Sequence, residues 1–223
     1  MYPRVNKVNT YEFNEINFSF YTEDYSIKID KEKCIGCGLC IKACPNNAIP
    51  HPRLEGKIRI KTEDLIPDTP DILKCSFCGT CAYICPLSAI SLKYNGEKMP
   101  TKEMGIIRKR VVPDLEYHLV NSNQKEIKVF FDGKIYVDWD KCISCMSCTE
   151  VCPSGAFFKL KKNLKSVHSK NKKVSFNQDK CISCGTCVNA CSKKVISLKI
   201  SNIHYSGDYK AIFWDSLLDR IKK

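Results

Sequence analysis

The residues of this chain best suited to chemistry are its cysteines, and all sixteen fall into four runs with one spacing, C-x2-C-x2-C-x3-C. Ionised cysteine thiols are strong ligands for soft metal ions. Three cysteines at two-residue intervals wrap a tight loop around one point, and the fourth, three residues later, points away from that loop. The spacing therefore predicts metal centres with thiolate ligands. We number the runs motif one to motif four in chain order: Cys34, Cys37, Cys40, Cys44; Cys75, Cys78, Cys81, Cys85; Cys142, Cys145, Cys148, Cys152; and Cys181, Cys184, Cys187, Cys191.

This spacing resembles that of bacterial-type ferredoxins, in which each run supplies ligands to [4Fe–4S] clusters. The resemblance covers roughly residues 25–95 and 130–200. Proline follows the first three motifs, at Pro45, Pro86 and Pro153, as in that family, whereas Ser192 follows motif four. The resemblance implies a polyferredoxin-like protein with four [4Fe–4S] clusters, similar to the polyferredoxins of methanogenic archaea.

In two-cluster ferredoxins the fourth cysteine of a run ligates the cluster of the other run. We expect motif one to pair with motif two and motif three with motif four, because the segments within these pairs are much shorter than the segment from Cys85 to Cys142. A nested pairing, first with fourth and second with third, occurs in four-cluster subunits of some molybdenum oxidoreductases, which usually stretch a motif. The tandem pairing implies four ligand sets: Cys34, Cys37, Cys40, Cys85; Cys75, Cys78, Cys81, Cys44; Cys142, Cys145, Cys148, Cys191; and Cys181, Cys184, Cys187, Cys152.

Two other uses of cysteine fit the sequence less well. Thiolate zinc sites typically use two C-x2-C pairs separated by a longer spacer, whereas three cysteines crowd each loop here. A disulfide framework is typical of small secreted domains, and this chain of 223 residues exceeds their size. The iron–sulfur interpretation is therefore favoured over both.

A duplication divides the chain, because motifs one and three are separated by nearly the same distance as motifs two and four. Strand patterns at 16–20 and 25–29, and at 127–131 and 135–139 with Asp132 and Gly133 between them, predict a hairpin before each half. We expect a short helix after the fourth cysteine of each motif. The predicted fold class is α+β, with two tandem ferredoxin-like dicluster modules, each with an extra N-terminal hairpin. The predicted ranges are 1–98 and 127–200 for the modules, 99–126 for a packed inter-module segment and 201–223 for a C-terminal amphipathic helix or tail.

Two segments outside the modules carry apolar patterns. Residues 106–112 are apolar and basic and are consistent with a strand in the inter-module segment. Near the C-terminus, five apolar side chains share one helical face, which predicts either a helix packed on its own module or a docking helix for a larger enzyme. These residues are Phe213, Trp214, Leu217, Leu218 and Ile221.

The formal net charge is +12, which is unusual for soluble ferredoxins. A [4Fe–4S] core with four thiolates carries about −2, so four clusters lower the net charge to about +4. Basic residues concentrate in two places, and for the lysine run between motifs three and four we expect a solvated loop, or a docking patch for an acidic electron carrier. They are Lys159, Lys161, Lys162, Lys165, Lys170, Lys172 and Lys173 between motifs three and four, and Arg108, Lys109 and Arg110 between the modules.

No catalytic constellation, nucleotide-binding loop or flavin motif is found. The four histidines, His51, His118, His168 and His204, are scattered, and we expect surface or structural roles for them. The basic run lacks the interleaved aromatic residues of a nucleic-acid site, so no nucleic-acid partner is expected. Because no catalytic constellation is found, no small-molecule substrate is expected either. No apolar run approaches the roughly 18–20 residues of a membrane span. A reducing, anaerobic cytoplasm is the expected location, because unligated thiols would oxidise.

The favoured function is the relay of single low-potential electrons through four [4Fe–4S] clusters, with any catalysis in a partner. By resemblance, that partner is a hydrogenase or a formylmethanofuran dehydrogenase. A second hypothesis is an obligate iron–sulfur subunit of a multi-subunit oxidoreductase, never free in solution. A third, a cluster that contacts substrate, would require an iron without a cysteine, and all four motifs are complete.

Overall fold

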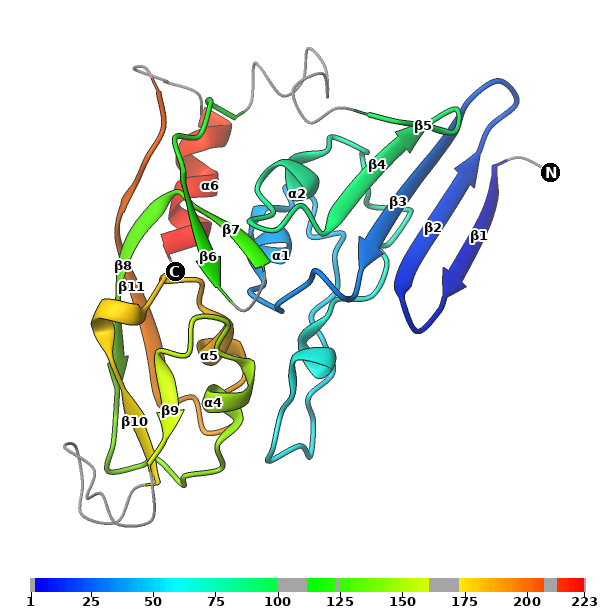
Figure 1. Cartoon of the computed structure of the whole chain (residues 1–223). Coiled ribbons are helices and arrows are strands. Elements are labelled where there is room, and N and C mark those ends of the chain that lie inside the picture. Colours follow the sequence, from blue (N-terminus) through cyan, green and yellow to red (C-terminus); the bar gives the residue numbers. More distant parts are fainter. Residues whose placement is uncertain (1–2, 100–111, 123–124, 161–172, 207–211, 223) are drawn as a thin grey trace.

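The computed structural model describes residues 3–99, 112–122, 125–160, 173–206 and 212–222, which include all sixteen cysteines. The elements form two halves, each built around two cysteine motifs (Figure 1). Most of the predicted strand at 106–112 lies outside the described residues, and so do Arg108, Lys109, Arg110 and the lysines between 161 and 172. No helix among the described residues is both long and apolar enough to cross a membrane.

A five-stranded antiparallel sheet dominates the first half. Its strands, in spatial order, are β1 (Arg4–Asn9), β2 (Phe13–Ser19), β3 (Asp24–Asp30), β4 (Ile90–Tyr94) and β5 (Glu97–Lys98). Burial alternates along β2, so that Ile16 and Phe18 point to one face with Ile27 and Ile29 of β3, as expected for a sheet with one face on a core. This face covers the loops of motifs one and two.

The second half is built from shorter antiparallel pairs. Strand β8 lies directly before motif three and pairs with β11 directly after motif four, as β3 pairs with β4 around motifs one and two. A second pair lies between motifs three and four, and a third pair precedes β8. The strands are β6 (His118–Ser122), β7 (Lys125–Val129), β8 (Phe131–Val137), β9 (Phe157–Lys159), β10 (Val174–Phe176) and β11 (Ile196–Ile203).

The hairpin predictions fare differently in the two halves. The segments at 16–20 and 25–29 correspond closely to β2 and β3, which pair with each other. The prediction for 127–131 and 135–139 is wrong, because β7 pairs with β6 and β8 pairs with β11. Gly133 lies inside β8, where a Cβ atom would come within 2.9 Å of Leu198 Cδ1 and 3.2 Å of the Lys199 carbonyl oxygen. The glycine therefore allows close packing against β11 and forms no turn, and a hairpin in each module is not confirmed.

The prediction of a short helix after each fourth cysteine is wrong, because each motif has its short helix before that cysteine. Each helix begins one residue before the third cysteine. After the fourth cysteine the chain turns, and the third residue beyond it has a positive φ between 50° and 64°, a left-handed conformation that ends a helical path. The helices are α1 (Leu39–Ala43), α2 (Thr80–Tyr83), α4 (Ser147–Val151) and α5 (Thr186–Asn189), and two 3₁₀ helices, η1 (Thr62–Leu65) and η2 (Gln178–Lys180), lie between motifs.

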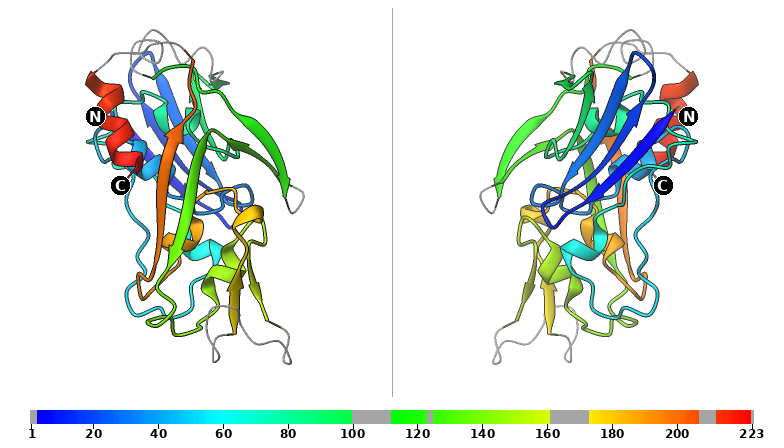
Figure 2. Two further views of the ribbon diagram at one scale, coloured as in Figure 1. Left: turned by 90° about the vertical axis from the view of Figure 1, so that its left-hand side faces the viewer. Right: turned by 90° about the vertical axis from the view of Figure 1, so that its right-hand side faces the viewer.

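The segment between motifs one and two packs on the second half. Ile60 and Leu65 are buried against Val151 of α4 and Ala190 beside α5. The Ile60 N–H donates to Ser147 Oγ at 2.8 Å, and Arg59 forms an ion pair with Glu150. In Figures 1 and 2 this segment lies beside α4 and α5. The first half thus extends an arm over the motifs of the second.

The C-terminal helix α6 (Ile212–Lys222) makes the reciprocal contact. Its predicted apolar face is found, since Trp214, Leu217 and Ile221 are buried. These side chains pack against α1 of the first half as well as against β11, so the helix packs on both halves rather than on its own module alone. Figure 2 shows α6 beside α1. The side chain of Phe213 lies outside the described residues.

Replacing Trp214 by Ala tests this contact between the halves. Trp214 is fully buried in the core shared by α1, β11 and α6, and truncation of a buried tryptophan costs about 3–5 kcal/mol. We expect the Trp214→Ala holoprotein to lose its visible cluster absorbance at a clearly lower urea concentration than the unmodified chain. Ser216→Ala, on the exposed face of the same helix, is the matched control and should leave the midpoint unchanged. Equal midpoints for the two variants would contradict the packing role.

Candidate metal centres

Each motif folds as a loop that turns back on itself with the same backbone pattern. The second residue after the first cysteine and the first residue after the second cysteine have positive φ angles between 52° and 78°. Left-handed residues between right-handed ones aim successive backbone N–H groups at one concave site, which suits an anionic group. Glycine occupies four of these eight positions, since it adopts positive φ without steric cost. The residues are Gly36, Gly38, Phe77, Gly79, Ser144, Met146, Ser183 and Gly185.

One backbone hydrogen bond recurs four times and pairs the motifs. In each case the N–H of the residue four places before a first cysteine donates to the carbonyl four places after the fourth cysteine of another motif, at 2.7–2.9 Å. The bonds join motif one with motif two in both directions, and motif three with motif four in both directions. Each fourth cysteine is thereby brought to the loop of the paired motif. The donors and acceptors are Asp30 and Ala89, Asp71 and Ala48, Asp138 and Val195, and Asn177 and Ala156.

Cysteines from two different motifs line the same hollow. Three hollows are each lined by three cysteines of one motif and the fourth cysteine of its pair. In the remaining group, Cys152 lies within electrostatic reach of Cys181, Cys184 and Cys187. The groups that line the three hollows are Cys34, Cys37, Cys40 and Cys85; Cys44, Cys75, Cys78 and Cys81; and Cys142, Cys145, Cys148 and Cys191.

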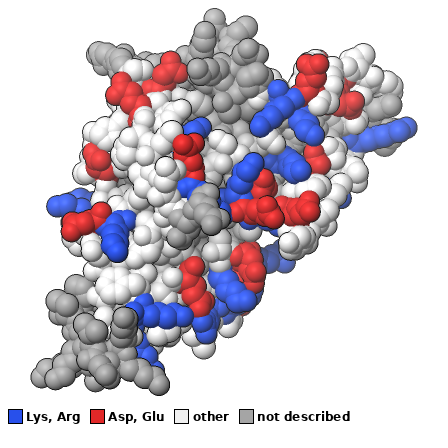
Figure 3. Space-filling view, in the orientation of Figure 1, with Lys and Arg blue, Asp and Glu red and all other residues white. Residues whose placement is uncertain are grey.

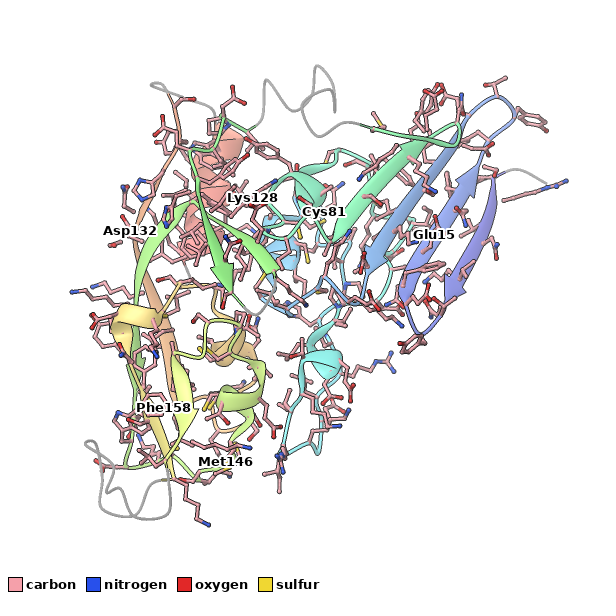
Figure 4. All side chains as sticks on the ribbon, viewed as in Figure 1. Glu15, Cys81, Lys128, Asp132, Met146 and Phe158 are labelled. Atoms are coloured by element: carbon pink, nitrogen blue, oxygen red, sulfur yellow. The ribbon has the colours of Figure 1, made fainter. Side chains whose placement is uncertain are left out.

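None of the sixteen cysteines forms a disulfide in the structure. Among the described residues, no three His, Cys, Asp or Glu side chains converge as ligands for one metal ion. Figure 4 shows the sulfur of Cys81 together with other sulfurs in the interior of the first half, beside α1 and α2. In three of the four groups the thiols line one shared hollow.

Burial dominates the electrostatics of these thiols. It raises the pKa of Cys34 to about 11, and the nearby Cys85 thiol also raises it. Burial likewise raises the pKa of Cys184 to about 11 and that of Cys148 to about 12, and it raises the pKa of Cys40 well above its ordinary value. At neutral pH such thiols stay protonated unless a cation stabilises the thiolate. The positive core of an iron–sulfur cluster supplies that stabilisation.

Hydrogen bonds reach the sulfur atoms from the backbone and from hydroxyl groups. The N–H groups of Ala48, Ala89 and Val195 donate to the fourth-cysteine sulfurs Cys44, Cys85 and Cys191 at 3.1–3.4 Å. Hydroxyls of Thr80, Ser147 and Thr186 lie 3.3–3.6 Å from the second-cysteine sulfurs Cys78, Cys145 and Cys184. Leu39 stands at the corresponding position of motif one. Such bonds stabilise negative charge on sulfur and tune the reduction potential of a bound cluster.

The thiol groups also form a continuous series. Cys81 of motif two lies within electrostatic reach of Cys40 of motif one. Cys184 of motif four is within reach of Cys37 of motif one, and Cys148 of motif three is within reach of Cys187 of motif four. The spatial order is therefore motif two, one, four, three. The two halves meet where motif one lies beside motif four.

Four residues important for this arrangement were missed by the sequence analysis. Each stands four places before a first cysteine, and its side-chain oxygen accepts a hydrogen bond from the N–H two or three residues later, at 2.8–3.3 Å. Such turns are typical of Asp and Asn, and they set the entry of the chain into each loop. An acidic or amide residue at this fixed offset is the signal that could have found them: Asp30, Asp71, Asp138 and Asn177.

The histidines lie apart from the motifs, as far as the structure describes them. His51 and His118 are exposed. His204 Nε2 lies 2.9 Å from Asp132 Oδ2, and His168 falls outside the described residues.

The comparisons with known proteins agree with the geometry. Models of 4Fe–4S dicluster domains match residues 134–192 and 74–156, and a model of a 4Fe–4S binding domain matches residues 27–49. The match at 74–156 joins motif two to motif three, because all motifs share one spacing, whereas the structure places motif two beside motif one. No curated protein sequence matches the chain.

A solved structure resembles the whole chain. It is a chain of the formate dehydrogenase–heterodisulfide reductase–formylmethanofuran dehydrogenase complex from Methanospirillum hungatei, with a TM-score of 0.75 and 20% sequence identity. The alignment covers 100% of this chain and 92% of that chain. At this identity the likeness establishes the fold. Domains of the matching type carry electrons through iron–sulfur clusters. The protein thus consists of tandem 4Fe–4S dicluster ferredoxin domains, whose sixteen cysteines fit four [4Fe–4S] clusters.

Proposed function

We propose that the chain is an iron–sulfur subunit of a multi-subunit oxidoreductase, in which it relays electrons between a catalytic subunit and another carrier. The observation that carries the proposal is the full-length likeness to one chain of the Methanospirillum complex, which spans both halves and the elements that join them. Because that complex includes a formylmethanofuran dehydrogenase, an enzyme of this type is the first candidate for the catalytic partner. A hydrogenase is the second candidate.

The ligand assignment is part of this proposal. We assign each cluster to three cysteines of one motif and the fourth cysteine of its pair, in the tandem sets implied by the ferredoxin resemblance. The support comes from the shared hollows and from the four backbone hydrogen bonds that join motif one to two and three to four. The nested pairing receives no such support from these bonds.

When bound, a [4Fe–4S] cluster accepts and releases one electron at a time. The residues of the chain determine the environment of this transfer. The buried side chains of Ile29, Ile35 and Ile90 exclude water from the hollow between motifs one and two, while backbone N–H groups donate to sulfur. The contact between motifs one and four joins the two halves into one path, in the order two, one, four, three.

A freely diffusing polyferredoxin is the alternative. It fits the same clusters and the same path, and the basic net charge of the chain is compatible with either role. The subunit is favoured because the chain of the large complex matches over 92% of its own length, so this protein has the dimensions of an assembled component.

The metal content tests the cluster assignment directly. Anaerobically reconstituted protein should contain about sixteen irons and as many acid-labile sulfides, as four [4Fe–4S] clusters require. Metal analysis by mass spectrometry, with a parallel zinc measurement, provides the count. About eight irons, or four zinc ions in place of iron, would overturn the assignment.

Two triple variants test the exchange of fourth cysteines. If Cys85 ligates the motif-one cluster, then Cys34→Ala/Cys37→Ala/Cys85→Ala removes three ligands of one cluster and leaves about twelve irons in three complete clusters. The matched variant Cys75→Ala/Cys78→Ala/Cys85→Ala damages two clusters and should retain fewer irons. Iron content and the electron paramagnetic resonance of the reduced proteins distinguish the two results. The reverse order of iron contents would show that each motif holds its own fourth cysteine.

Anaerobic affinity purification of the tagged chain from its native host tests the subunit role. We expect stoichiometric recovery with a larger oxidoreductase, identified by mass spectrometry and retained through size-exclusion chromatography. Recovery of an iron-rich monomer alone would favour the diffusible carrier instead.

A further inference from the structure

The two ends of the thiol series differ in the chemistry of their walls. Motif two lies at one end and motif three at the other. Figure 4 labels a residue of each, Cys81 in the interior of the first half and Met146 in the lower part of the second. At both ends the wall includes the residues that follow the contributed fourth cysteine, which makes the two ends directly comparable.

At the motif-two end the residues after the fourth cysteine are hydrogen-bonded to other parts of the chain. Pro45 and Asn46 line the hollow after Cys44. Asn46 Nδ2 donates to the Lys74 carbonyl at 2.8 Å, and Asn47 Oδ1 accepts from Arg220 of α6 at 2.6 Å. Arg220 also donates to the Cys44 carbonyl at 2.7 Å. Arg220 of the C-terminal helix thus anchors this turn, although Asn46 and Asn47 are exposed.

At the motif-three end the corresponding turn carries two lysines. Ser192 and Lys193 line the hollow after Cys191, and Lys193 and Lys194 are both exposed. Neither lysine has an acidic partner within 4.0 Å in the part of the chain that the structure describes. This is the one motif in which serine and lysines replace the Pro-x-x sequence.

The backbone of Lys194 has a left-handed conformation. Lys194 has a φ of 52°, and the corresponding positions of the other motifs are Asn47, Ser88 and Gly155. Glycine and asparagine adopt this left-handed conformation more readily than a long side chain does. The turn thus holds a lysine in a conformation that glycine and asparagine adopt more readily.

The surroundings of this turn favour a protein partner. Ile143 lines the same hollow and is 47% exposed, so an apolar side chain separates the metal site from solvent. Nearby charges are largely paired within the chain: Lys141 with Asp138 at 2.8 Å, and Glu150 with Arg59. Asp140, on the same loop, is exposed. In Figure 3 the lower part of the molecule carries Lys and Arg side chains together with a few acidic ones.

We propose that Lys193 and Lys194 form the docking site for an acidic redox protein, which exchanges electrons with the motif-three cluster past Ile143. The inference rests on the proposed relay function and adds that the motif-three end of the electron path is where the partner docks. Unpaired lysines at a cluster steer a partner of opposite charge and accelerate its association. One electron passes from the reduced redox group of the partner to the oxidised motif-three cluster, or in the reverse direction, and no other co-reactant is needed.

Stopped-flow electron transfer tests this docking site. The probe is a pre-reduced dicluster ferredoxin of strongly negative net charge, mixed anaerobically with the oxidised full-length holoprotein at low and high ionic strength. We expect Lys193→Glu/Lys194→Glu to lower the second-order rate constant at low ionic strength by about tenfold or more and to abolish its decrease with salt. Lys193→Asn/Lys194→Asn, which copies the asparagines of the other end, should give an intermediate rate.

The matched control is Lys93→Glu/Lys98→Glu, which makes the same change of charge on a cross-strand pair of β4 and β5. It should change the rate less than about twofold, because steering acts locally. An equal fall in both double variants would show an effect of net charge alone and overturn the proposal, as would unchanged rates in both. Iron content and chemical reduction by dithionite are measured for each variant. Loss of the clusters themselves would count against the relay function, and intact clusters with unaltered rates would count against the docking site only.

Discussion

The structure depends above all on the deprotonation of buried thiols. Sixteen cysteines lie partly or fully buried in the protein, and each must lose its proton to act as a metal ligand. Burial alone favours the neutral thiol, as the raised pKa values of Cys34 and Cys148 show. Thiolates are stable there only with iron to neutralise them and with N–H and hydroxyl donors aimed at sulfur. The repeated left-handed residues and the paired backbone hydrogen bonds serve this need, so metal binding and folding are coupled.

The contact between the halves follows from the same requirement. Electron transfer across the molecule needs motif one close to motif four, and a small interface of loops would not hold them together. The arm that ends in Leu65 packs on α4 and α5, and α6 packs on α1. Gly36 shows how close the packing is, because a Cβ atom there would lie 2.2 Å from Leu65 Cβ. Each half thereby covers the metal loops of the other.

The sequence predicted the parts of the structure that short-range patterns encode. The cysteine spacing predicted the four cluster sites, and the 3.6-residue pattern predicted the buried face of α6 through Trp214, Leu217 and Ile221. Long-range pairing was less accessible. The Asp132-Gly133 dipeptide has the composition of a turn, yet its glycine serves the approach of β11, a strand distant in sequence. Local propensity carries no information on such a partner. The reciprocal contacts of the arm and α6 were missed for the same reason, and the division into modules at 1–98 and 127–200 stays a prediction.

The place of α6 in the chain has a consequence for how the protein matures. Because α6 follows all four motifs, the ribosome has released motif one long before Trp214 and Arg220 exist to cover it. At roughly 5–20 residues per second, the interval from α1 to α6 is on the order of ten seconds or more. During that time the turn after Cys44 and the face of α1 that packs on α6 lack these contacts. Docking of α6 on α1 therefore follows the synthesis of all four motifs.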